Sequence, residues 1–283
     1  MGDAPLVWRG KGVEWEVRRT LVMGILNVTP DSFSDGGQHF AMRAAVERGL
    51  QIAEEGADLL DIGGESTRPR SQPVAAEEEW RRIGGVIPAI RRKSAIPISV
   101  DTRKPEVARK AIEAGAAFVN DVSGLRDPAM AKLVAETGVG AVIMHMQGEP
   151  AAMQADPHYD DVVGEVRAFL ARQLESAVAA GVPREAIVLD PGIGFGKTAE
   201  HNRELLRGLP RIRSLGRPVL VGVSRKSMLA EFHPEGDRRR FEASLAAAGF
   251  AVQHGANIVR VHDVGETVRY VRMLDSLLGA AGG

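Results

Sequence analysis

The sequence alternates between short apolar runs, each ending in a polar or glycine-rich tip, and longer amphipathic stretches. Short apolar runs bounded by turn residues are typical of buried parallel strands. In the longer stretches, hydrophobic positions recur every three or four residues, as they do on one face of a helix. The apolar runs predict eight strands, at residues 21–28, 57–62, 97–100, 117–119, 140–144, 187–190, 218–223 and 257–261.

The amphipathic stretches predict helices at residues 41–55, 76–93, 105–114 and 128–136, and a long helix after residue 159. Each predicted strand is followed by a helical stretch, and the composition does not change from one unit to the next. Strict alternation of strand and helix favours a parallel sheet. Eight such units in 283 residues favour a closed (β/α)8 TIM barrel. We therefore predict an α/β fold with residues 1–283 in one barrel domain.

The segment at about residues 6–18 precedes these units and has a different pattern. Apolar and polar residues alternate there around Gly10 and Gly12, which predicts a β-hairpin. We expect this hairpin to close the bottom of the barrel.

Composition narrows the class of protein. With a net charge of −1 and a pI of about 6.7, the protein has no strong positive electrostatic field that would attract nucleic acid or anionic lipid. The chain has no cysteine, which excludes disulfides, a thiolate nucleophile and cysteine-ligated zinc. No apolar run is long enough to span a bilayer, and the N-terminus lacks the pattern of a secretory signal. We expect a cytoplasmic protein without a nucleic-acid or membrane partner.

Polar residues gather at the carboxyl ends of the predicted strands, the face on which barrel enzymes build their active sites. Asp101, Asn120 and Asp190 end the third, fourth and sixth strands. Two carboxylates and an amide in an apolar cup suit a flat heterocycle rich in N–H donors. Lys226 adds a point charge that can face a ring oxygen or nitrogen. The competing interpretation is that strand-end Asp and Asn residues cap the next helix.

The stretch from Asp190 to Thr198 carries a carboxylate at the junction between a strand and a glycine-rich loop. A carboxylate is costly to bury there unless N–H donors satisfy it. The stretch departs from the phosphate-binding pattern GxxxxGKT because Pro191 occupies the place of the first glycine. Alternatively, the glycines are ordinary turn residues and Asp190 is a cap.

A second group of residues suits an anion: Asn27, Thr67, Arg260 and His262. The guanidinium of an arginine matches the geometry of a phosphate, and an oriented histidine can donate to one. The alternative is that Arg260 and His262 form supporting or surface pairs.

Two long polar tips, at residues 29–37 and 63–71, are bounded by glycine and are predicted to be mobile. They carry the third group of candidates: Phe33, Thr67, Arg68 and Pro69. Met144 and Phe195 are further candidates, although such residues more often belong to a core.

Eight motifs in order carry a resemblance that spans residues 23–264. They are MGILNVTPDSFSDGG from Met23, DIGGESTRP from Asp61, SVDT from Ser99, NDVSG from Asn120, MHMQG from Met144, DPGIGFGK from Asp190, GVSRKS from Gly222 and RVHDV from Arg260. With these motifs the chain resembles the dihydropteroate synthases, the sulfonamide targets of folate biosynthesis. One departure is Arg70, which stands where that family usually has glycine.

The resemblance implies a pterin-binding barrel that condenses 6-hydroxymethyl-7,8-dihydropterin diphosphate with p-aminobenzoate to give 7,8-dihydropteroate and pyrophosphate. It implies that Asp101, Asn120, Asp190 and Lys226 hold the pterin, with Met144 in its pocket. Asn27 would contact Mg²⁺ on the diphosphate, and Thr67, Arg260 and His262 would hold the phosphates. The p-aminobenzoate pocket would be formed by Phe33, Arg68, Pro69, Phe195, Lys226 and Ser227. Asp101, Asp190, Lys226, Arg260 and His262 are the expected catalytic residues, and a homodimer is expected.

Two alternatives stay open at this point. A corrinoid-linked methyltetrahydrofolate methyltransferase shares the pterin-binding barrel, but it would need neither the Ser224 to Ser227 segment nor the anion site at Arg260 and His262. A barrel that binds pterin or a partner protein without catalysis is the other alternative.

Overall fold

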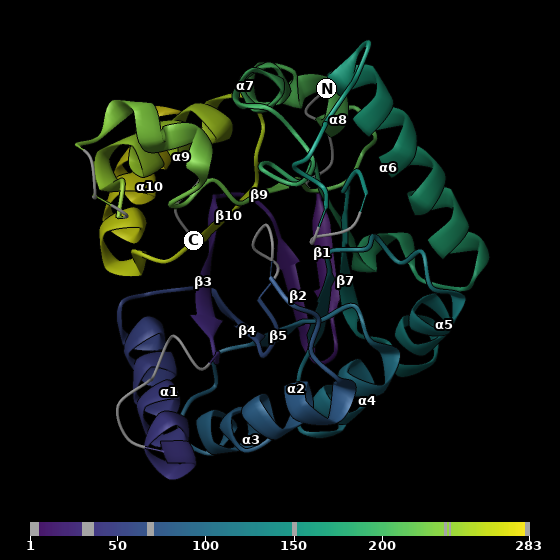
Figure 1. Cartoon of the computed structure of the whole chain (residues 1–283), viewed down its shortest axis with the longest axis vertical. Coiled ribbons are helices and arrows are strands. Elements are labelled where there is room, and N and C mark those ends of the chain that lie inside the picture. Colours follow the sequence, from purple (N-terminus) through teal and green to yellow (C-terminus); the bar gives the residue numbers. More distant parts are fainter. Residues whose placement is uncertain are drawn as a thin grey trace.

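The computed structural model describes residues 6–29, 37–66, 71–148, 152–234, 237 and 239–280, without the side chains of 37–40. Its central sheet has eight parallel strands in the order β8-β7-β6-β5-β4-β3-β10-β9, and helices surround it (Figure 1). A parallel bridge between Leu189 and Val219 joins the two edge strands. The predicted TIM-like barrel is confirmed.

The bounds of the elements follow the predicted pattern closely. The barrel strands are β3 Leu21–Asn27, β4 Leu59–Gly63, β5 Ile98–Asp101, β6 Phe118–Asp121, β7 Gly140–Met144, β8 Ile187–Asp190, β9 Leu220–Val221 and β10 Ile258–Val261. The helices are α1 Gly37–Glu54, α2 Ala76–Ile83, α3 Val86–Arg91, α4 Pro105–Glu113, α5 Pro128–Thr137, α6 Val162–Ala179, α7 Ala199–Arg207, α8 Leu209–Arg213, α9 Phe241–Gln253 and α10 Val264–Leu277, with short 3₁₀ helices η2 Arg184–Ala186 and η3 Ser227–Phe232. In the part of the chain that the structure describes, no helix combines the length and apolarity needed to cross a membrane.

Two predicted elements differ from the structure. The single helix expected at residues 76–93 is wrong, because the chain forms α2 and α3 with Gly84 and Gly85 between them. Glycine weakens a helix interior, and Pro88 has no N–H to donate to the carbonyl of Gly84. The strand expected at residues 218–223 shortens to β9, which pairs with β10 only through Leu220 and Val221.

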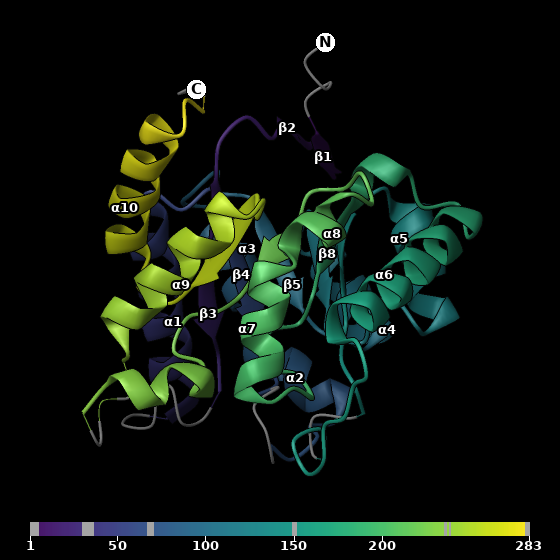
Figure 2. The same ribbon diagram turned by 90° about the horizontal axis from the view of Figure 1, so that it is seen from above.

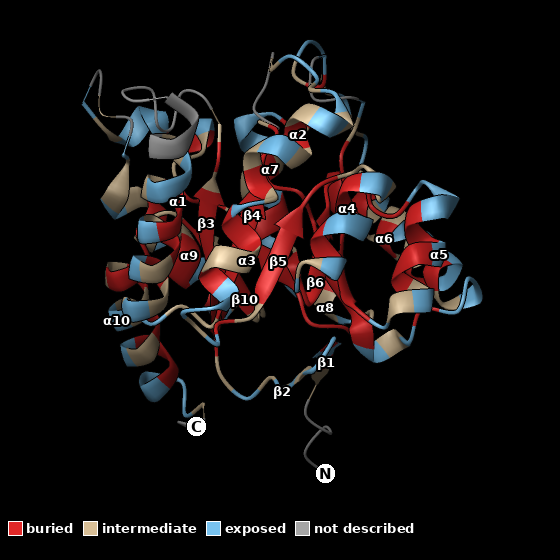
Figure 3. Cartoon of the chain, turned by 90° about the horizontal axis from the view of Figure 1, so that it is seen from below, coloured by how far each residue is buried: buried red, intermediate tan, exposed pale blue. Residues whose placement is uncertain are grey.

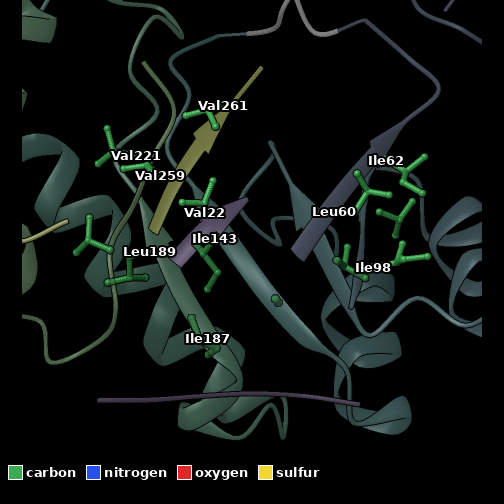
Figure 4. Packing of buried hydrophobic residues seen from close by; sticks show 14 of the residues in the cluster. Val22, Leu60, Ile62, Ile98, Ile143, Ile187, Leu189, Val221, Val259 and Val261 are labelled. Carbon is green, nitrogen blue, oxygen red and sulfur yellow. The ribbon is translucent and has the colours of Figure 1, made fainter. Parts of the chain in front are cut away.

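Side chains alternate between the two faces of each barrel strand, and this alternation makes two cores. Outward-facing residues such as Leu60, Ile62 and Ile98 pack against the helices, as the close view in Figure 4 shows. Inward-facing residues at the start of the strands form a second cluster around Phe118 and Met23. Figure 3 shows the strands buried, whereas the helices expose their outer faces. Further along the same inner faces the residues become polar, so the core ends where the candidate site begins.

The N-terminal hairpin consists of β1 Val7–Gly10 and β2 Val13–Glu16, which pair antiparallel. Its Trp8 side chain is fully buried against Phe118, with ring centroids 4.3 Å apart. The N–H of Lys11 donates to the carbonyl of Ala117, at the start of β6. The hairpin therefore closes the end of the barrel where the strands begin, as predicted, and Figure 2 shows β1 and β2 at one end of the molecule.

Candidate active site

The carboxyl ends of the strands surround a cavity of about 740 Å³. Residues two apart on a strand share a face, so the inward positions of neighbouring strands meet at one level of the barrel. Ten of the candidate residues line this cavity: Asn27, Asp101, Asn120, Met144, Asp190, Phe195, Lys226, Ser227, Arg260 and His262. The structure thus brings them to one place, while their individual roles remain predictions.

Four candidates, Phe33, Thr67, Arg68 and Pro69, lie outside the described residues, as does Arg70. Of the two predicted tips, the described residues include only the bases. At the base of the second tip, the Glu65 carboxylate accepts from the backbone N–H of Val74 (2.9 Å) and from Lys104 Nζ (2.7 Å). Lys104 also donates to the buried Glu79 (2.6 Å). This network ties the two sides of the tip together.

An arginine held between two carboxylates forms the floor of the cavity. Arg260 Nε donates to Asp61 Oδ2 (2.6 Å), and its Nη2 donates to Asp101 Oδ2 (2.7 Å). The amide of Asn120 donates to the same Asp61 oxygen (2.9 Å). Asp101 Oδ1 and Asn120 Oδ1 are buried and have no hydrogen-bond partner among the described residues. Two acceptors on lining residues are therefore available to a ligand that donates N–H bonds.

None of the three strand-end residues caps the next helix, and the N-cap of α7, the helix after Asp190, is Thr198. Asp190 Oδ1 accepts from the N–H of Gly192 (2.7 Å), so this side chain does brace its own loop. Asp101 and Asn120 instead bond to Arg260 and Asp61, and the N-cap of α4 has no side-chain hydrogen bond. Asp101 and Asn120 are therefore not caps.

Burial shifts the ionisation of these groups. Loss of hydration raises the pKa of Asp101 from 3.8 to about 7, although Arg260 opposes the shift. Burial likewise raises the pKa of Asp190 from 3.8 to about 6, and lowers that of Lys226 from 10.5 to about 8. Burial also acts to lower the pKa of Arg260, but Asp61 and Asp101 outweigh it and raise that pKa. Such perturbed groups in one cavity are typical of an active site.

A buried lysine shapes the glycine-rich loop after Asp190. Lys197 Nζ donates to the carbonyls of Gly192 and Phe195 (both 2.9 Å) and lies 2.9 Å from Nδ1 of His145. Burial lowers the pKa of His145 to about 2, so its neutral ring can accept this bond. Lys197 thus joins the loop to the end of β7 and is used structurally, not as a phosphate-binding group.

Gly192 has to be glycine, and replacing it tests how firmly the loop is held. Its φ is +68°, and an added Cβ would lie 1.8 Å from the carbonyl oxygen of His145. We expect Gly192→Ala to lower the free energy of unfolding by about 3 kcal/mol, through left-handed strain plus a backbone clash. Gly216→Ala is the matched control, since Gly216 has φ +75° and open space around its Cβ. That control should lose only about 1 kcal/mol in urea unfolding. Equal losses in the two variants would mean that the clash is relieved without cost.

Lys226 and Phe195 form one wall of the cavity. Lys226 Nζ lies 4.1 Å from the centroid of the Phe195 ring, a cation–π arrangement. Arg240 donates to the carbonyls of Arg225 (3.0 Å) and Lys226 (2.9 Å). These bonds hold the backbone from which Lys226 and Ser227 project.

The mouth of the cavity carries the remaining anion candidates. Nδ1 of His262 lies 3.0 Å from the hydroxyl of Ser224, whose oxygen also accepts from the backbone N–H of His262 (3.3 Å). Asn27 ends β3 at the same wall. Arg260, by contrast, lies deeper in the cavity, between two carboxylates. The candidate anion-binding residues predicted from sequence therefore do not all lie at the same depth. Among the described residues, no cluster of three or more His, Asp or Glu side chains could by itself hold a metal ion.

Sequence reasoning missed three residues of this site: Asp61, Lys197 as the loop's internal anchor, and Ser224. A signal did exist for Asp61, since it is a lone carboxylate inside the apolar run from Leu59 to Ile62. A charge at an inward position of a buried strand needs a partner on a neighbouring strand.

The barrel, with a cavity at the carboxyl ends of its strands, is matched by a family of pterin-binding enzymes. The family model described as "Pterin binding enzyme" matches residues 23–262. The dihydropteroate synthase of Escherichia coli (strain K12) is 44% identical over 270 residues, covering 95% of this chain and 96% of its own length.

Solved structures agree. The Xanthomonas albilineans dihydropteroate synthase with 4-aminobenzoic acid superposes with a TM-score of 0.89 at 48% identity, covering 95% of this chain and 97% of that one. The Yersinia pestis dihydropteroate synthase in a sulfonamide drug complex gives a TM-score of 0.91 at 40% identity, covering 97% and 100%. The chain belongs to the dihydropteroate synthase family, whose members are transferases. These relatives favour the synthase over the methyltransferase alternative.

Proposed function

We propose that the cavity joins 6-hydroxymethyl-7,8-dihydropterin diphosphate to p-aminobenzoate, forming 7,8-dihydropteroate and releasing pyrophosphate. The observation that carries this proposal is that Asp101 and Asn120, which line the same cavity as Asp190, each hold a buried acceptor oxygen without a hydrogen-bond partner among the described residues. Buried acceptors without partners are costly, and the N–H donors of a pterin would satisfy them. A relative from Xanthomonas albilineans has been solved in complex with 7,8-dihydropteroate.

In this proposal the pterin lies in the deep part of the cavity. Asp101, Asn120 and Asp190 accept from its N–H groups, Lys226 faces a ring acceptor, and Met144 packs against the ring. Arg260 is already neutralised by Asp61 and Asp101, so it can lie near the ring without leaving an unpaired charge. The carboxylates can also stabilise positive charge on the pterin methylene as the leaving group departs.

The diphosphate lies at the mouth, against Asn27, His262, the outer side of Arg260 and, outside the described residues, Thr67. Mg²⁺ fits this end because it takes oxygen ligands and is commonly held by one or two protein groups together with substrate phosphates. The amide oxygen of Asn27 is such a group, and the described residues offer no carboxylate cluster that would hold the ion alone. When bound, the ion would neutralise charge on the leaving diphosphate.

The p-aminobenzoate pocket uses the outer wall. Phe195, Lys226 and Ser227 supply its described half, and Phe33, Arg68 and Pro69 are proposed to supply the other half. The substrate already carries its leaving group, so the protein needs to orient the aniline nitrogen toward the methylene and requires no nucleophile of its own.

An assay of pyrophosphate release tests the proposal. Release is expected only when both the pterin diphosphate and p-aminobenzoate are present, with dihydropteroate formed in equal amount. A barrel that binds pterin without catalysis would bind 6-hydroxymethylpterin but release no pyrophosphate.

Removal of divalent metal is expected to reduce turnover to near background. Without the counter-charge of the metal ion, only protein side chains would stabilise the departing diphosphate. Turnover is measured in excess chelator and again after Mg²⁺ is restored. Full activity in chelator would remove Mg²⁺, and the role of Asn27, from the proposal.

We also expect p-aminobenzoate to bind about tenfold or more tightly once pyrophosphate and Mg²⁺ are present. Asn27 lies just before the tip that carries Phe33, and Thr67 lies in the tip that carries Arg68 and Pro69, so an anion bound by Asn27 and Thr67 would stabilise the arrangement that completes the pocket. Calorimetric titration with and without pyrophosphate and Mg²⁺ measures the difference. Equal affinities would show that the pocket is complete without the anion.

We further propose that the whole chain is one pterin-binding domain that works as a homodimer. Light scattering should then give twice the chain mass of 30.3 kDa.

A further inference from the structure

Asp61 lies beneath the cavity, where it touches two lining residues without lining the cavity itself. It is an inward residue of β4, and its exposed fraction is 0%. One of its oxygens, Oδ2, accepts from Arg260 Nε (2.6 Å) and from Asn120 Nδ2 (2.9 Å). Arg260 and Asn120 are 199 and 59 residues away in the chain.

This arrangement determines which end of the Asn120 amide faces the ligand. An asparagine amide has a donor end and an acceptor end of nearly the same shape, so its orientation is set by its partners. The Asp61 oxygen already receives a charged N–H from Arg260, and a carboxylate oxygen in that position can only accept. The amide must therefore turn Nδ2 toward Asp61, and Oδ1 is the atom left buried without a partner among the described residues.

We infer that Asp61 is a positioning residue that sets the hydrogen-bond polarity of Asn120, so that the pocket selects an amino-bearing ring edge over an oxo-bearing one. The inference rests on the proposed pterin site and adds a cause for its selectivity. An asparagine at position 61 would offer both a hydrogen-bond donor and an acceptor. The amide of Asn120 could then bond to it in either of its two orientations. The pocket would then offer a donor or an acceptor at nearly equal cost.

The test compares two ligands whose ring edges differ: 6-hydroxymethylpterin, which carries a 2-amino group and an unprotonated N1, and 6-hydroxymethyllumazine, which carries a 2-oxo group and a hydrogen on N1. Calorimetry gives the ratio of their affinities for the wild-type protein and for Asp61→Asn, Asn120→Ala and the double variant. An effect of Asp61 that acts through Arg260 would persist in the Asn120→Ala background, so the double variant separates it from an effect on Asn120.

We expect the wild-type protein to prefer the pterin and Asp61→Asn to lower that preference by about tenfold, the effect of reversing one buried hydrogen bond. Asn120→Ala should lower it similarly, and adding Asp61→Asn to Asn120→Ala should change it no further. A purely structural role would weaken both ligands equally and leave the ratio unchanged, and that result would overturn the inference. An equal loss of preference with and without Asn120 would overturn it too.

A measurement on the wild-type protein covers the case in which Asp61→Asn does not fold. Both N–H groups that bond to Asp61 Oδ2 lie close together, so the side-chain amide protons of Asn120 should show a nuclear Overhauser effect to Arg260 Hε with and without bound 6-hydroxymethylpterin. Loss of that effect on binding, with new contacts from the amide protons to the pterin, would contradict the inference.

The proposed function is checked separately by Asp190→Asn. If Asp190→Asn loses pterin affinity while Asp61→Asn keeps the wild-type ratio, the inference fails and the pterin site stands. If neither variant affects pterin binding, the proposed site itself is wrong.

Discussion

Asp190→Asn is expected to lower the affinity for 6-hydroxymethylpterin by about a hundredfold or more. A carboxylate can accept two parallel N–H bonds from an amino-pyrimidine edge, whereas asparagine turns one acceptor into a donor that faces a donor. The variant keeps the shape of the side chain and its place at the end of β8. Calorimetry measures the change, and near-wild-type affinity would remove Asp190 from the pterin site.

The same substitution should stabilise the ligand-free protein above pH 6. Burial raises the pKa of Asp190 from 3.8 to about 6, so its contribution to stability is fully present below pH 3.8 and is lost as the pH rises through about 6. At pH 8 the buried charge then costs on the order of 3 kcal/mol, which asparagine does not incur. Urea unfolding at pH 4 and pH 8 should show a gain at pH 8 only.

Asp58→Asn is the matched control for this pair of effects. Asp58 immediately precedes β4, does not line the cavity, and pairs with Arg19 (2.6 Å) and Arg272 (3.2 Å). Its substitution should lower stability and leave pterin affinity near that of the wild type. A stability loss in Asp190→Asn at pH 8 would show that the charge of Asp190 is fully compensated in place.

Arg260→Met is expected to give the second large effect, a loss of both substrate binding and stability. The substitution leaves the carboxylates of Asp61 and Asp101 buried without their shared cation, and breaking a buried pair in this way costs about 3–5 kcal/mol. Diphosphate binding should fall as well, because the guanidinium no longer faces the leaving group.

This stability loss should depend on pH. Burial already raises the pKa of Asp101 from 3.8 to about 7 in the presence of Arg260, and removing the cation raises it further. Stability is therefore retained while the carboxyl is protonated and is lost as the pH rises through and above 7. Unfolding of the variant and the wild type at pH 5 and pH 8 should show the larger difference at pH 8.

His262→Ala is the control for the anion site. Nδ1 of His262 lies 3.0 Å from the hydroxyl of Ser224, and the loss of this side chain should weaken pyrophosphate binding. A difference between Arg260→Met and the wild type that stays constant from pH 5 to pH 8 would contradict the ion-pair account.

The periodicity of the chain was enough to predict the barrel, the hairpin and the strand ends. Alternation along a strand and the spacing of apolar residues on a helix are local properties, so they can be read without knowing what packs against what. The predicted run at residues 140–144 became β7 Gly140–Met144 without change. Local reasoning was wrong at Gly84 and Gly85, which separate α2 from α3, and it made the strand at residues 218–223 longer than the observed β9.

By itself, then, the sequence determined which residue types stand at the strand ends. Because strands and helices alternate along the chain, it also predicted that the strands are parallel and that Asp101, Asn120, Asp190 and Arg260 line one cavity. Only the tertiary structure decided how they are paired. Asp61 meets Arg260 across 199 residues, and Lys197 meets His145 across 52. No local pattern encodes such partners, because a buried charge requires a counter-group but its own sequence neighbourhood does not specify which strand supplies it.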